Sequence, residues 1–108
     1  DMLEKDEELQ KRKAALTADA HSALGMVALY REDPPTAADE FKAAIAGGSG
    51  ANPTNYFRLG EAYETMGKLD QAIEAFQNAA DLGTGTAFQD FANKKIAEIK
   101  ARKGLVTR

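Results

Sequence analysis

The chain repeats part of its own pattern at an offset of 35 residues, and this repeat restricts its possible folds more than any other feature. A leucine–glycine pair and a phenylalanine recur together at that offset, which is hard to obtain by chance in 108 residues. The matched pairs are Leu24 and Leu59, Gly25 and Gly60, Ala37 and Ala72, Phe41 and Phe76, and Ala44 and Ala79. A period in the mid-thirties is typical of stacked helical hairpins. The sequence therefore predicts an all-α chain in which two hairpins bury their apolar sides against each other.

The second copy of the pattern, residues 52–84, contains signals for two helices joined by a turn. Asn52 can cap the first helix, and Pro53 follows at the first helical position, where its missing N–H costs little. Gly67 interrupts the helical pattern, and Gly83 stands just past the end of the second helix. Such a hairpin has one apolar side and needs a neighbour of the same shape.

The spacing of residues in this second copy resembles a tetratricopeptide repeat. The matching residues are Tyr56, Leu59, Gly60, Tyr63, Gly67, Ala72, Phe76 and Ala79, and only the closing proline, near Thr84, is missing. The resemblance implies a right-handed α-solenoid of two hairpins, with an N-terminal extension helix and a C-terminal capping helix. It is specific for the fold and not for a ligand.

The first copy, residues 18–50, matches the family pattern less closely. His21 stands where the pattern has a large aromatic residue, and Ala28 where it has a tyrosine. The turn between its helices is Glu32 to Pro35 rather than a glycine turn. Because the chain has one histidine and no cysteine, we interpret His21 as a residue filling an aromatic slot and not as part of a catalytic or metal site.

We expect a single domain over residues 1–108. Its parts are an N-terminal helical extension (1–17), the first repeat (18–50), the second repeat (53–84), a capping helix (86–103) and a frayed tail (104–108).

The extension has no glycine or proline, so one long helix from Leu3 to Tyr30 is one interpretation, and a new helix capped by Thr17 is the other. In the first repeat, Leu24, Val27 and Ala28 are expected to face the core. In the capping helix, the stripe expected to face the repeats is Phe88, Phe91, Ala92, Lys95, Ile96 and Ile99.

Composition excludes several classes of function. The net charge of −3 disfavours binding to nucleic-acid backbones. The absence of cysteine excludes disulfides and thiolate chemistry. No apolar run approaches the roughly 20 residues that a bilayer-spanning helix needs, so we expect no membrane insertion in this chain. We also expect no enzyme activity, no cofactor and no metal, and the compartment is left undetermined.

The resemblance implies that the leading helix of each hairpin lines a concave face, which makes this face the expected interaction surface. Met26 and Phe57 lie off the packing stripe of their helices, and Leu29 and Tyr30 exceed the apolar positions that one hairpin requires. A peptide or partner helix would bind there, with charged residues at the rim. The predicted binding residues are Ser22, Met26, Leu29, Tyr30, Phe57, Arg58, Glu61 and Glu64.

Two alternatives to this hypothesis remain open. The N-terminal helix could fold over Met26, Leu29 and Phe57 and bury them within the chain. The chain could also be a structural segment of a larger protein that self-associates through its apolar face or the ends of the array. One family subtype binds acidic peptide tails through lysine and asparagine, but Ser22 and Met26 occupy those positions here, and Glu61 and Glu64 favour a neutral or basic peptide.

Overall fold

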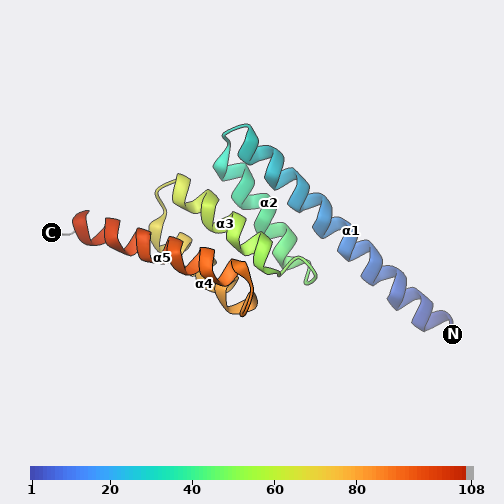
Figure 1. Cartoon of the computed structure of the whole chain (residues 1–108). Helices are drawn as coiled ribbons and strands as arrows, with labels where there is room; N and C mark the ends of the chain where they lie inside the picture. The colour runs from blue at the N-terminus through green and yellow to red at the C-terminus, as the bar shows by residue number, and fades with distance from the viewer. Residues whose placement is uncertain (107–108) are drawn as a thin grey trace.

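A computed structural model describes residues 1–106 of the chain, and within these residues the structure contains five helices and no strand (Figure 1). The helices are α1 (Met2–Tyr30), α2 (Pro34–Ala46), α3 (Pro53–Thr65), α4 (Leu69–Leu82) and α5 (Ala87–Val106). α1 pairs with α2, α3 pairs with α4, and α2 packs against α3, which joins the two hairpins. α5 packs mainly on α4. The fold is an all-α helical-repeat solenoid, as the repeat predicts. None of the helices in this part of the chain has the length and apolar character needed to cross a membrane.

α1 is one continuous helix, which decides between the two interpretations of the N-terminus. The carboxylate of Asp1 caps it by accepting from the Leu3 N–H at 2.6 Å. The Thr17 hydroxyl donates to the Lys13 carbonyl within the helix, so it does not cap a new one. Residues 2–14 are exposed throughout, and this half of α1 extends away from the other helices (Figure 1).

Local signals set the remaining helix starts and turns. The Asp33 side chain caps α2 ahead of its two prolines, and the Asn52 side chain caps α3. The turn between α3 and α4 places Gly67 at a φ of 75°, which glycine adopts at no steric cost. The equivalent residue in the first hairpin is Glu32, at a φ of 57°, a conformation that costs a residue with a Cβ about 1–2 kcal/mol.

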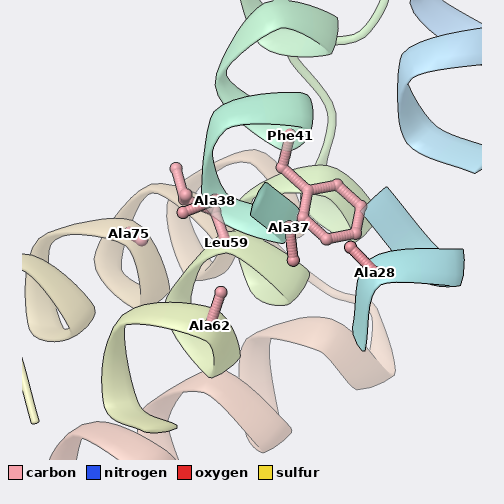
Figure 2. Close-up of a cluster of buried hydrophobic side chains, with 7 residues drawn as sticks. All are labelled: Ala28, Ala37, Ala38, Phe41, Leu59, Ala62 and Ala75. Atoms are coloured by element: carbon pink, nitrogen blue, oxygen red, sulfur yellow. The ribbon is translucent and has the colours of Figure 1, made fainter. Parts of the chain in front are cut away.

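The core consists of two apolar clusters, one centred on Phe41 and one on Phe76. Each ring lies on a glycine of the preceding helix. A Cβ atom added to Gly25 would lie 2.8 Å from the Phe41 ring, and one added to Gly60 would lie 2.7 Å from the Phe76 ring. Figure 2 shows the first cluster, in which Phe41 lies among small alanine side chains from neighbouring helices. The repeated glycine and phenylalanine are therefore two halves of one contact, made once in each hairpin.

Leu24 and Val27 were expected in the core, and this expectation is wrong. Leu24 is 52% exposed and Val27 is also exposed, whereas the matched residue Leu59 is 6% exposed. Leu59 is buried because α2 of the preceding hairpin packs against it. Within the described residues, α1 is the first helix and no helix covers the face of Leu24. Ala28 is buried as predicted.

The C-terminal helix differs from expectation at two places. Ala92, Ile96 and Ile99 are buried in the second cluster, but Phe91 is exposed rather than facing the repeats. α5 continues to Val106, three residues past the expected end of the capping helix, and residues 107–108 of the expected tail lie outside the described part of the chain.

Candidate protein-interaction face

A hollow of about 430 Å³ lies between the two leading helices, α1 and α3. Five of the eight predicted binding residues line it, together with Thr65. The lining residues are Met26, Leu29 and Tyr30 from α1, and Arg58, Glu61 and Thr65 from α3. We call this surface the α1/α3 hollow. Its position follows from the repeat, because α1 and α3 are equivalent helices of adjacent hairpins.

The α1 side of the hollow is apolar. Met26 and Leu29 are half-buried and pack against the cluster around Phe41, so they form a fixed floor. Tyr30, the last residue of α1, is 86% exposed. A large aromatic ring held on a helix end in this way is the kind of side chain that dominates protein–protein contacts, because it buries much area and loses little freedom.

The α3 side of the hollow is polar but locally neutral. The Arg58 guanidinium donates to the Glu61 carboxylate at 2.8 Å, and both side chains are partly exposed. The Thr65 hydroxyl donates to the Glu61 carbonyl at 2.9 Å. Arg58 and Glu61 neutralise each other, so this rim does not by itself favour a basic peptide. Glu61 therefore no longer supports the expectation that the partner is basic.

Glu64 lies outside the hollow. Its side chain is 16% exposed and accepts from the Lys95 ammonium at 3.2 Å and from the Arg102 guanidinium. Both cations come from α5, so this carboxylate attaches α5 to α3. The pattern of a single hairpin does not contain these partners, which lie 31 and 38 positions away along the chain.

Phe57 is part of the packing between α3, α4 and α5. Its ring makes edge-to-face contacts with Phe76, at a centroid separation of 5.2 Å, and with Phe88, at 6.2 Å. The expectation that the core does not need this ring is therefore wrong. Phe57 also borders a second hollow of about 280 Å³, between α3 and α5, to which Phe91 and Lys94 contribute.

Ser22 is engaged inside the structure. Its hydroxyl lies 2.9 Å from the Asn55 side-chain oxygen and 3.1 Å from the Ala18 carbonyl. Asn55 is buried, and its amide donates to the Gly50 carbonyl at 2.9 Å. This network holds α1, α3 and the loop between the hairpins together, and it was not predicted from the sequence. The sequence feature that could have indicated this network is Asn55, a polar residue three positions after the Asn52 cap.

His21 has a polar partner that the sequence did not indicate. Its Nδ1 atom lies 2.6 Å from the Glu40 carboxylate on α2, and both side chains are partly buried. The equivalent positions of the second hairpin hold Tyr56 and Ala75. The pair links the two helices of the first hairpin, so His21 contributes a cross-helix contact and not only volume.

A third hollow, of about 300 Å³, lies on the other side of α3, at the junction of α2, α3 and α4. Tyr56 and Tyr63 line it with Lys42 and Glu74. It is the seam between the two hairpins, and none of the predicted binding residues reaches it.

The N-terminal helix does not cover the α1/α3 hollow. Because α1 is one continuous helix, its first half extends along the helix axis away from the other helices (Figure 1), and residues 2–14 are all exposed. The alternative in which the extension folds back over Met26, Leu29 and Phe57 is therefore wrong.

The comparison with known families agrees with this geometry. Residues 22–87 match the model of the tetratricopeptide repeat, a span that contains the two glycine–phenylalanine contacts and the α1/α3 hollow. A search of curated proteins finds no individual match to the chain. With a match over more than half of its length and two equivalent hairpins in its structure, the chain belongs to the tetratricopeptide repeat family.

Proposed function

We propose that the chain is a non-catalytic module that binds a peptide or a partner helix in the α1/α3 hollow. Tetratricopeptide repeats generally mediate protein–protein interaction. The observation that carries the proposal is the exposed Tyr30 beside the half-buried Met26 and Leu29, on the face that the leading helices share.

Affinity in this proposal comes from the apolar side of the hollow. Met26 and Leu29 are already held by the core, so a partner does not have to order them on binding. Tyr30 would pack on an apolar residue of the partner, and full burial of a large side chain contributes about 1.5–3 kcal/mol. The bound segment would present one or two apolar residues toward α1.

In this proposal, Arg58 and Glu61 set the orientation of the bound segment. Each has donors or acceptors left over after their mutual ion pair, so they can bond to the backbone or polar groups of a bound segment. Capture of an acidic peptide tail is disfavoured, because Ser22 is bonded to Asn55 and Met26 is apolar. A neutral segment fits best.

The test is a selection of displayed peptides on the full chain, followed by measured affinities for variants. We expect Tyr30→Ala to weaken the selected peptides at least about tenfold, as loss of a central aromatic contact does. Leu82→Ala is the matched control, since Leu82 is also exposed and lies on α4, away from the hollow. Equal affinities for both variants would contradict the proposal.

A further inference from the structure

An apolar stripe, interrupted by Asp6 and Lys13, runs along the exposed face of α1. Ala20 and Val27 belong to it, and both are exposed. The stripe has the alternating spacing of three and four residues that two packed helices use, and it lies opposite Ala18 and Gly25, which are buried. Every seventh residue of α1 from its start is apolar and exposed, namely Met2, Leu9, Leu16, Ala23 and Tyr30.

The first half of α1 has no packing partner within the described residues. Residues 2–14 are all exposed, and Leu16, at the middle of the stripe, is 69% exposed. Isolated helices of about 12–15 residues are marginal in water. The stripe is therefore the surface through which a second helix would stabilise this half.

The second half of the stripe lies on the side of the first hairpin where a preceding hairpin would pack. Leu24 borders the stripe and occupies the position at which Leu59 is buried by the preceding helix α2. The face of Leu24 and Val27 is therefore shaped to receive a helix on its outer side.

We infer that this stripe binds the same stripe of a second copy of the chain, with the two α1 helices antiparallel. The helix is about 43 Å long at 1.5 Å per residue. The three–four spacing aligns Met2 with Val27 of the second copy, and Leu9 with Ala20. Each uncovered N-terminal half then covers the uncovered C-terminal half of the other copy, so the contact is two-fold symmetric and closed.

The charges of α1 select the antiparallel direction. Residues 4–8 hold four acidic side chains and one lysine, and residues 11–13 are all basic. A parallel pair would place each block against itself. In the antiparallel pair, the acidic block faces residues 21–25, which contain no acid, and Arg12 lies near Asp19 of the second copy. Asp6 and Lys13 interrupt the stripe. In this alignment Asp6 lies opposite Ala23 of the second copy, and the aliphatic stem of Lys13 lies over Leu16 of the second copy.

This proposal does not rest on the peptide-binding role, and its tests avoid Tyr30, which borders both surfaces. Because these 108 residues contain no cysteine, single-cysteine variants report contacts without background. We expect a mixture of Leu9→Cys and Ala20→Cys to form a disulfide-linked dimer on mild oxidation. In a dimer of either variant alone, the cysteines of the two copies would be offset by 11 residues along the helix axis. This offset is about 16 Å, which is too far for a disulfide. Lys11→Cys mixed with Ala20→Cys is the control, since Lys11 lies on the opposite face of α1.

Sedimentation equilibrium supplies the second measurement. The wild-type chain is expected to be a dimer, and Leu9→Lys should raise its dissociation constant at least about tenfold. Ala14→Lys, which adds the same charge on the other face, should leave it unchanged. Circular dichroism checks that both variants stay folded. A wild-type monomer at concentrations up to about 0.5 mM, an unaltered dimer in Leu9→Lys, or stronger self-linking of Leu9→Cys than mixed linking would each overturn the inference.

Discussion

Gly60→Ala tests the contact that the two hairpins share. In an exposed helix this change stabilises by about 1 kcal/mol, because alanine is the better helix former. In α3 the new methyl group would lie 2.7–2.9 Å from three atoms of the Phe76 ring, well inside the 3.5–4.0 Å of a favourable carbon contact. The ring is fully buried and cannot move away, so we place the packing cost near the top of the usual range of about 1–3 kcal/mol. The net expected loss is about 2 kcal/mol.

The assay is thermal and urea unfolding of Gly60→Ala beside Gly104→Ala. Gly104 lies in α5, and a Cβ added there meets no atom of the described residues within 4 Å, so this control reports mainly the helix-propensity gain. We expect Gly60→Ala to lower Tm by roughly 10 °C and Gly104→Ala to leave it equal or slightly higher. Adding Phe76→Leu should recover part of the loss, because the smaller side chain makes room for the methyl group. If Gly60→Ala stabilises the chain as much as Gly104→Ala does, the ring does not lie on the glycine and the packing described for both hairpins is wrong.

Three further predictions concern stability. Phe57→Ala should lower the free energy of unfolding by about 2 kcal/mol, which is less than the loss of a fully buried ring costs, whereas Phe91→Ala removes an exposed ring and should change it little. Equal effects of the two variants in urea unfolding would contradict the assigned packing. Glu32→Gly should raise stability by about 0.5–1 kcal/mol and Glu32→Val should lower it, because φ at this turn is positive; the same sign for both in thermal unfolding would count against that turn. Glu64→Gln should cost about 1 kcal/mol and speed amide hydrogen exchange in α5, since two cations of that helix lose their carboxylate; unchanged exchange would show that the ion pairs do not hold α5.

The fold could be predicted because its signals are local and repeated. Asn52, Pro53 and Gly67 set the boundaries of the second hairpin, and the structure places its helices accordingly. The glycine–phenylalanine spacing predicted stacked hairpins, although the contact between the two residues was not foreseen. The continuity of α1 was left open because Thr17 can either cap a helix or bond within one.

Burial was harder to predict, because it depends on the neighbouring helix and not on the pattern of one helix. Leu24 and Leu59 occupy the same position, yet among the helices of residues 1–106 only Leu59 has a preceding helix against it. Phe57 lies off the stripe of its own hairpin, but α5 approaches it from the other side. The residue pattern of one hairpin does not show that a third layer packs against it.

The candidate site was predicted in part for the same reason. Met26, Leu29 and Tyr30 come together with Arg58 and Glu61, because the repeat places α1 and α3 side by side on one face. The Glu64 ion pairs and the Ser22–Asn55 network involve partners far along the chain, so neither residue could be assigned from spacing alone.

The most direct test of the central claim, that the leading helices form an open binding face, is a map of amide chemical shifts during titration with a selected peptide. We predict that the largest changes fall on Met26, Leu29 and Tyr30 of α1 and on Arg58 and Glu61 of α3. Changes centred instead on α2 and α4, the return helices, would contradict the account.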